Sequence, residues 1–264
     1  MVIRESKKPW IITIIVLTVI ILGLGGYIAY DYFILSKDEE KIVTVIDDVN
    51  INLNAFYQIS DTLEKFDKAY NTPGTNYYGY IYGSKKLEAK KMDPKAALYA
   101  ALASEMIPSN VRQTIPGDRV KNNLKRMFGD IIKYNPEEVN IDGTLKIGYD
   151  KVNNIHAYTI PVKNTNYSNG YVTANIKTYL KDDYVIITRK TFYVEYSDPN
   201  SPINATVYTS SSKRGRLGTV SVKNGQVNTK EVLSKYSTKL NTYDFYFIKN
   251  SDEDYTFYKV IKTR

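Results

Sequence analysis

The fold of this chain is decided by the stretch Tyr243-Asp-Phe-Tyr-Phe-Ile-Lys249, which continues through Asn250-Ser-Asp-Glu-Asp254 into Tyr255-Thr-Phe-Tyr-Lys-Val-Ile-Lys262. Apolar residues alternate with polar ones in both arms, and turn-forming residues separate the arms. Alternation places successive side chains on opposite faces of a strand, so the stretch predicts an antiparallel hairpin with one buried face. The residues expected on that face, packed against helices, are Phe245, Phe247, Phe257 and Val260.

Three more hairpins are predicted upstream, because the pattern changes from helical to alternating near Asn140. Their strands are expected at 144–149 with 155–162, at 171–180 with 184–196, and at 205–210 with 217–222. The chain holds 25 tyrosines and one tryptophan. Tyrosine suits strands with one buried and one solvated face, so this composition favours an antiparallel sheet.

Helices are predicted ahead of these hairpins. Residues 40–70 carry apolar side chains every three or four positions, the alanine-rich segment 94–106 follows an Asp93-Pro94 start signal, and 118–128 runs from a capping Asp118 to Gly129. A short tyrosine-rich strand is expected at 77–82 and a short helix at 229–236. Helices followed by hairpins predict an α+β fold, with helices packed on one face of a curved antiparallel sheet.

The apolar segment 10–33 predicts a membrane anchor. Its uncharged part from Trp10 to Tyr30 measures roughly 30 Å as a helix, the thickness of a hydrocarbon core. Trp10, Tyr27 and Tyr30 are expected at the membrane interfaces. A cleaved signal peptide and a buried core helix are the alternatives, but the long apolar run without an A-x-A-like site favours a retained anchor.

The charges that flank the anchor predict its orientation. Arg4, Lys7 and Lys8 precede it, whereas acidic residues dominate just after it. Because cations collect on the cytoplasmic side, the N-terminus is expected inside the cell membrane. The chain then divides into a cytoplasmic tail at 1–9, a single-pass transmembrane anchor at 10–33 and an extracytoplasmic α+β domain at 34–264.

The overall charge and the lack of cysteine limit the classes of partner and of chemistry. The chain has 36 Lys and Arg against 28 Asp and Glu, a net charge of +8. The expected partners are the lipid bilayer, an anionic cell-wall polymer or lipid head groups, and other membrane proteins, whereas an extracytoplasmic domain is not expected to meet nucleic acid.

The chain has no cysteine, which excludes disulfides, thiolate metal sites, cysteine nucleophiles and lipoprotein anchoring. An extracytoplasmic domain without disulfides suits a bacterium.

Catalytic chemistry finds little support in the residues. His156 is the only histidine, which excludes a two-histidine metal site, and a lone histidine in a predicted strand is interpreted as structural and not as a member of a catalytic triad. Acidic residues at Asp142, Asp182-Asp183 and 252–254 fall in turns, where they usually bond to backbone amides. Hydrolysis of a glycan by two carboxylates stays open, because that role depends on their separation in space. No catalytic residue, cofactor or metal is therefore assigned.

One loop is suited to anion contact. The segment Ser210-Ser-Ser-Lys-Arg-Gly-Arg216 combines hydroxyls, a glycine and three cations, Lys213, Arg214 and Arg216, which can contact a phosphate or sulfate. A solvated hairpin tip is the simpler interpretation of the same residues. The tyrosines at 77, 78, 80 and 82 are a second candidate, because their rings can stack on sugars, although ordinary sheet packing is the favoured interpretation.

Together, the anchor, the tyrosine-rich stretch before Lys85-Lys86, the segment from Val120 to Gly129 and the closing hairpin resemble signal-anchored extracytoplasmic proteins of low-GC Gram-positive bacteria. This resemblance implies a place at the cell surface and supplies no activity and no catalytic residues. The expected architecture is also similar to the cystatin-like or nuclear-transport-factor-like cone. The leading hypothesis is a non-enzymatic binding or envelope-associated module. The alternatives are an assembly subunit of a membrane or secretion complex and a carboxylate-dependent hydrolase.

The predicted topology can be tested with thiol labelling, since the chain has no cysteine of its own. A cysteine placed near Lys249 is expected to react with a membrane-impermeant reagent on intact protoplasts. A cysteine at Ser6, in the predicted tail, is expected to react only after lysis and serves as the control. Labelling of the Lys249 site only after lysis would contradict the orientation.

Overall fold

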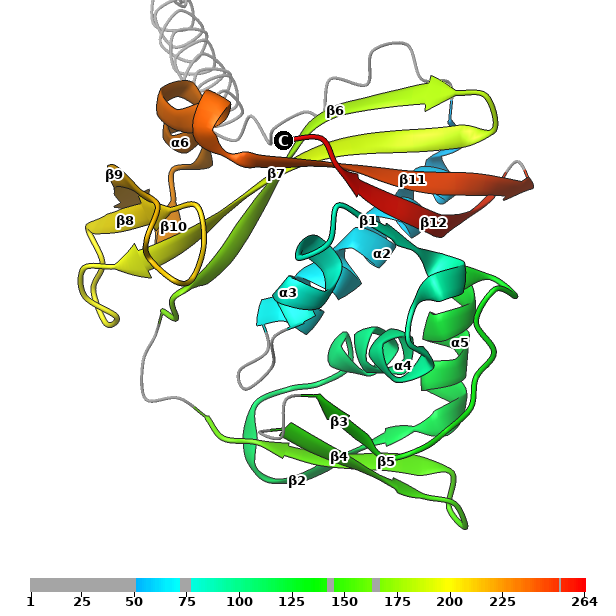
Figure 1. The fold of residues 1–264 in the computed structure, drawn as a ribbon. Helices are drawn as coiled ribbons and strands as arrows, with labels where there is room; N and C mark the ends of the chain where they lie inside the picture. Colours follow the sequence, from blue (N-terminus) through cyan, green and yellow to red (C-terminus); the bar gives the residue numbers. More distant parts are fainter. Residues whose placement is uncertain (1–50, 72–76, 142–144, 163–166, 252) are drawn as a thin grey trace, which may run out of the picture. The chain divides into compact units, whose positions relative to one another are not determined.

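The computed structural model describes residues 51–71, 77–141, 145–162, 167–251 and 253–264 (Figure 1). The predicted tail and anchor with Trp10, Tyr27 and Tyr30, the first part of the helix predicted from residue 40, and Asp142 lie outside the described residues. Within the described ranges, none of the helices has the length and apolar character needed to span a membrane.

The described chain has a mixed α+β fold. Its helices are α2 (Leu53–Asn71), α3 (Tyr77–Tyr82), α4 (Pro94–Ala103), α5 (Gly117–Phe128) and α6 (Thr229–Tyr236), with the 3-10 turns η1 (Ala89–Lys91) and η2 (Ser237–Lys239). Its strands are β1 (Lys86–Glu88), β2 (Ser109–Pro116), β3 (Val139–Ile141), β4 (Leu145–Asp150), β5 (Ile155–Ile160), β6 (Gly170–Lys181), β7 (Tyr184–Tyr196), β8 (Asn204–Tyr208), β9 (Arg216–Lys223), β10 (Gln226–Val227), β11 (Asn241–Ser251) and β12 (Asp254–Lys262).

The strands form two antiparallel sheets. The large sheet has eight strands in the order β1-β12-β11-β7-β8-β9-β10, with β6 beside β7, and the small sheet has four in the order β2-β5-β4-β3. All four predicted hairpins are confirmed, as β4–β5, β6–β7, β8–β9 and β11–β12. The expectation of one sheet was wrong. The hairpin β4–β5 is flanked by β3 and by β2, a strand that the sequence did not indicate, and these four strands form their own sheet.

The helices pack between the two sheets (Figure 1). Helix α2 contacts β6 and β12 of the large sheet and also α4 and α5, which in turn contact β3 and β2 of the small sheet. The prediction that helices pack on one face of the large sheet therefore holds for α2. Helix α6 differs, because it covers the opposite face at the far end of that sheet, where Phe192 and Val194 of β7 join Val232 in a second core.

Local signals explain most helix ends. The side chain of Asn52 accepts a hydrogen bond of 2.9 Å from the Asn54 amide, and the described helix α2 begins after it, at Leu53. The predicted cap of α4 is confirmed, since Asp93 accepts 2.8 Å from the Lys95 amide. The predicted cap at Asp118 was wrong, because α5 already starts at Gly117 after Pro116. Gly129, at φ 60°, ends α5 as predicted.

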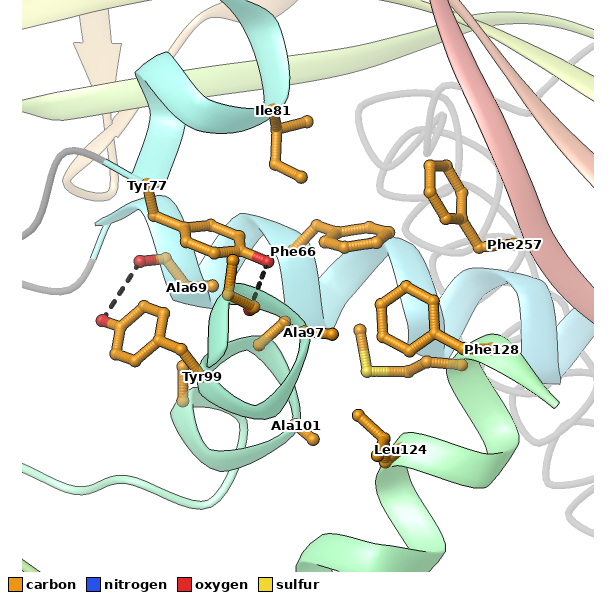
Figure 2. Packing of buried hydrophobic residues seen from close by; sticks show 14 of the residues in the cluster. Phe66, Ala69, Tyr77, Ile81, Ala97, Tyr99, Ala101, Leu124, Phe128 and Phe257 are labelled. Atoms are coloured by element: carbon orange, nitrogen blue, oxygen red, sulfur yellow. Dashed lines mark hydrogen bonds between the residues drawn. The ribbon is translucent and has the colours of Figure 1, made fainter. Parts of the chain in front are cut away.

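The strand predicted at 77–82 is a helix, α3. Tyr77 and Ile81 lie one helical turn apart and are both fully buried, and the Tyr77 hydroxyl donates a 2.8 Å bond to the Ala96 carbonyl (Figure 2). Tyr78 and Tyr82 are spaced in the same way, and both rings pack edge-on against Tyr70 at 5.7 and 5.5 Å. Tertiary packing at a four-residue spacing thus overrides the strand preference of tyrosine.

The main core is an aromatic cluster between α2, α5 and the closing hairpin. The Phe66 ring lies 5.1 Å from that of Phe257 and 6.1 Å from that of Phe128, and all three side chains are fully buried (Figure 2). Figure 2 also shows Ala97 and Ala101 on α4, whose small side chains allow close helix packing. The predicted inward residues of the hairpin, Phe245, Phe247, Phe257 and Val260, are all in this core, so that prediction is confirmed.

Truncation of Phe257 to alanine is expected to lower the free energy of unfolding by about 3 to 5 kcal/mol, because it leaves a cavity among four other phenylalanine rings. The measurement is urea unfolding followed by circular dichroism. The matched control is Leu180→Ala, since Leu180 is 44% exposed, and a change below about 1 kcal/mol is expected there. Similar losses in both variants would show that the aromatic cluster is not the main core.

Candidate functional site

The candidate site is the outer face of the large sheet, on the side opposite α2. Strand register sets Tyr179 of β6 beside Ile186 of β7, Ile186 beside Tyr246 of β11, and Tyr246 beside Lys259 of β12. These residues form one row across four strands. At about 4.8 Å between strands, the row is about 14 Å long. Since it lies on a sheet, the row presents a flat stripe to solvent and not a pocket.

A β-bulge adds one more tyrosine to this face. In the hairpin, Tyr246 pairs with Lys259 and Phe247 with Phe257, so Tyr258 is an extra residue between the two pairs. A bulge of this kind breaks the alternation and re-aims a side chain. As a result, the consecutive residues Tyr258 and Lys259 both reach the outer face.

Three tyrosine rings surround the Lys259 ammonium as a consequence. Its Nζ lies 4.3 Å from the ring centre of Tyr246, 5.4 Å from that of Tyr258 and 5.8 Å from that of Tyr184. The Tyr184 ring is itself 5.3 Å from Tyr258 and 6.0 Å from Tyr246. Attraction between an ammonium and the ring faces holds this cation above the sheet. Lys177 repeats the arrangement, with Nζ 5.0 Å from the Tyr179 ring centre.

We call these residues the tyrosine–lysine face: Tyr179, Tyr184, Tyr246, Tyr258, Lys177 and Lys259. The four rings and Lys259 are half-buried and Lys177 is exposed, whereas Ile186 beneath them is 1% exposed. Partial burial raises the pKa of Tyr179, Tyr184 and Tyr246. The nearby Asp244 raises the pKa of Tyr179 and Tyr246 further, and Tyr258 does the same for Tyr184. The phenols of Tyr179, Tyr184 and Tyr246 therefore stay neutral near pH 7 and keep their O–H donors.

Other charges near this face are partly engaged already. Asp244 accepts a 2.7 Å hydrogen bond from the Thr188 hydroxyl on the neighbouring strand. Glu88 of β1, which pairs with Lys259 in the register, forms ion pairs with Lys86 at 2.5 Å and with Lys90 at 3.6 Å. Lys181 adds an exposed cation at the end of β6. The surroundings of the face thus hold cations as well as acids, and the acids include Asp182 and Asp183 in the turn before Tyr184.

The far end of the same sheet surface is covered. Lys190 of β7 points to the outer side and donates to the Ser237 carbonyl at 2.7 Å and to its hydroxyl at 2.6 Å, so η2 lies over that end. Helices α2 and α5, which contact β12, lie on the inner side with Phe257. The described part of the chain leaves the rings of the tyrosine–lysine face partly exposed.

The loop with Lys213, Arg214 and Arg216 lies elsewhere, in the connection from β8 to β9. All three cations are exposed, but the Lys213 ammonium forms an ion pair with Glu195 of β7. The Ser211 amide donates 3.0 Å to the Tyr171 hydroxyl, which ties the loop to β6. The structure therefore keeps these residues together at a hairpin tip and partly neutralises them.

The other residues considered from sequence have structural roles. Tyr77 and Tyr82 of α3 are buried, so their rings are closed to a sugar. Asp182 and Asp183 form the β6–β7 turn, with Asp182 at φ 54°. In the described part of the chain, no group of three or more His, Asp or Glu side chains is placed to hold a metal ion.

His156 is fully buried in the small sheet. Its Nε2 lies 3.2 Å from the Tyr134 hydroxyl, its ring lies 4.9 Å from that of Tyr149, and its Nδ1 has no hydrogen-bond partner among the described residues. Burial lowers the pKa of His156 to about 4. A neutral imidazole packed between two phenol rings serves the fold of the small sheet.

Protein-family models, curated proteins and solved structures yield no match to the chain.

The buried histidine predicts a pH dependence of stability. Its ordinary pKa of 6.5 applies to the unfolded chain and falls to about 4 on folding, so only the unfolded state binds the proton between these values. The stability is therefore complete above pH 6.5 and falls as the pH drops toward 4, by on the order of 3 kcal/mol from this group. Urea unfolding is measured above pH 6.5 and near pH 4. The free energy of unfolding is expected to fall less on acidification for His156→Gln than for the natural chain. Equal losses of stability in the variant and the natural chain would show that His156 is not the source of the pH dependence.

Proposed function

We propose that this chain is a membrane-anchored, extracytoplasmic binding module that holds an anionic carbohydrate polymer of the cell envelope on its tyrosine–lysine face. The observation that carries the proposal is the row Tyr179–Ile186–Tyr246–Lys259, with Lys177 and Tyr258 beside it. The anchor at 10–33, the cytoplasmic N-terminus and the kinship with Gram-positive surface proteins belong to the same proposal. A cone-like curvature of the large sheet around α2 is also part of the proposal.

The residue types suit such a ligand. Tyrosine rings offer flat apolar faces on which the C–H faces of sugar rings stack, and their neutral hydroxyls donate hydrogen bonds to sugar oxygens. The ammonium groups of Lys177 and Lys259 pair with phosphate or carboxylate groups on the polymer. A flat stripe of about 14 Å accommodates several consecutive units of an extended polymer, whereas a small molecule finds no enclosing walls there.

The face is prearranged for contact. Lys259 is already held by three rings and Lys177 by one, so less side-chain freedom is lost on binding than for a mobile surface lysine. Exposed charge pairs still contribute only about 0.2 to 1 kcal/mol each. Their attraction is screened over about 8 Å at physiological salt. Binding is therefore expected to be weak per unit, to strengthen with polymer length and to weaken with salt.

A second candidate function, an assembly subunit of a membrane or secretion complex, is favoured by the edge strand β6. This strand of 12 residues pairs only with β7 among the described strands, so one edge offers backbone groups to another chain. The Asn71 side chain already uses one position of that edge. It donates 2.9 Å to the Tyr171 carbonyl and accepts 3.0 Å from the Tyr171 amide. Self-association in detergent that a proline at Thr173 abolishes would support this alternative.

The binding proposal is tested with the full chain in detergent and polygalacturonate at low salt, with uncharged dextran as the ligand control. The face variant is Lys177→Ala with Lys259→Ala. The matched control is Lys213→Ala with Arg214→Ala and Arg216→Ala, which removes more charge. The face variant is expected to weaken binding roughly threefold to tenfold, and the control to change it less.

Two results would contradict the proposal. A larger loss in the loop variant would place the anion contact at the β8–β9 connection. Losses that simply follow the number of cations removed would show that net charge and not this face attracts the polymer. Circular dichroism melting of both variants checks that the fold is intact, which is expected because every substituted side chain is partly or fully exposed.

A further inference from the structure

A cleft beside the end of the closing hairpin carries a second inference, independent of the proposed function. It has a volume of about 860 Å³ and is bounded by Gln58 of α2, by the C-terminal turn of α5 and by Asn250 and Asp254 at the end of the β11–β12 hairpin. Binding sites for small molecules usually have volumes of about 300 to 1,000 Å³. The cleft thus has the size of a small-ligand site, unlike the flat tyrosine–lysine face.

One wall presents a positioned carboxylate. Asp254 Oδ1 accepts a 2.7 Å bond from the Gln58 amide nitrogen, and Oδ2 accepts a 3.2 Å bond from that of Asn250. Gln58 is held in turn, because it also donates 3.0 Å to the Arg126 carbonyl. These partners are neutral, and Asp254 forms no ion pair with any described residue. The carboxylate is therefore held in place by two neutral donors, and none of the described cations is paired with it.

The α5 side of the cleft provides the opposite charge. Lys125 and Arg126 lie in the last turn of α5 and line the cleft. Lys125 is exposed and forms no ion pair within the described ranges, whereas the Arg126 guanidinium lies 3.5 Å from Asp61. Asp130, also exposed, follows on the same rim. The cleft thus combines two carboxylates with two cations, of which Arg126 is already paired with Asp61. A ligand that bears only one sign of charge leaves the groups of the other sign without a partner in the ligand.

An apolar contact completes the site. Ile131 lines the cleft and is 42% exposed. Gly129 lies beside it at φ 60°, where a Cβ atom would approach the Thr256 methyl group to 3.3 Å. The absence of a side chain there brings the end of α5 close to β12 and sets the shape of the cleft floor.

We propose that this cleft binds a small zwitterion of the peptide class, a free amino acid or a dipeptide. The ammonium group of the ligand pairs with Asp254 and Asp130, where the C-terminal end of the α5 dipole also favours a cation. The ligand carboxylate pairs with Lys125 and with Arg126. The ligand side chain lies against Ile131. The carboxylates, the cations and the single apolar contact thus each correspond to one part of such a ligand, and the hydrogen bonds from Gln58 and Asn250 hold Asp254 in position for it.

The test uses the full chain in detergent and calorimetric titration with alanyl-alanine. Saturable binding is expected, and the N-acetylated and the C-amidated dipeptides are each expected to bind at least about tenfold more weakly, since each lacks one charge. Ile131→Trp is expected to fill the cleft and abolish binding without disturbing the fold, because Ile131 is partly exposed. The matched control is Val152→Trp, at a position that is 93% exposed in the β4–β5 turn, and it is expected to bind as the natural chain does.

Three outcomes would overturn the inference. The first is the absence of saturable alanyl-alanine binding. The second is binding of either blocked dipeptide with the same affinity as alanyl-alanine. The third is unchanged alanyl-alanine binding by the Ile131→Trp variant. The polygalacturonate titration, repeated on Ile131→Trp, separates the two proposals. This variant is expected to keep polymer binding while it loses the dipeptide, so either proposal can fail while the other stands.

Discussion

The structure depends on one constraint, the two-residue period of the closing hairpin. Because successive side chains of a strand point to opposite faces, Phe245 and Phe247 enter the core while Tyr246 between them faces outward. The rings of Phe245 and Phe257 meet Phe66 of α2, which fixes the helix on the sheet. The same backbone register that closes the core therefore places Tyr246 beside Lys259 on the outer face. Stability and the candidate site are two consequences of a single register.

A buried ion pair supports this arrangement at Asp67, the residue of α2 that follows Phe66. The Arg189 guanidinium, with 4% of its side chain exposed, donates bonds of 2.9 and 2.6 Å to the two oxygens of Asp67. It also lies 5.6 Å from the Phe245 ring. Removing one partner of such a pair leaves a buried charge and typically costs about 3 to 5 kcal/mol. The pair thus allows only one alignment of α2 along β7, the alignment that the phenylalanine cluster requires.

Much of the fold could be predicted from the sequence, because alternation and turn residues are local signals. All four hairpins and the ends of α4 and α5 at Asp93 and Gly129 follow from them. The division into two sheets could not be predicted, since it depends on β2 pairing with β5 far along the chain. The site was missed for a similar reason. A tyrosine in a strand has the same local pattern whether it is buried or solvated, and only the register and the bulge at Tyr258 bring these rings together.

The most direct measurement of the central claim, that the tyrosine–lysine face binds an anionic polymer, is ring ¹³C NMR of the tyrosines during titration. Replacement of single tyrosines by phenylalanine assigns the signals. The account predicts that the rings of Tyr184, Tyr246 and Tyr258 shift together and with one affinity, while Tyr208 next to the Lys213 loop stays unchanged. A shift of Tyr208 alone, or no shift of the three rings at saturating polymer, would contradict it.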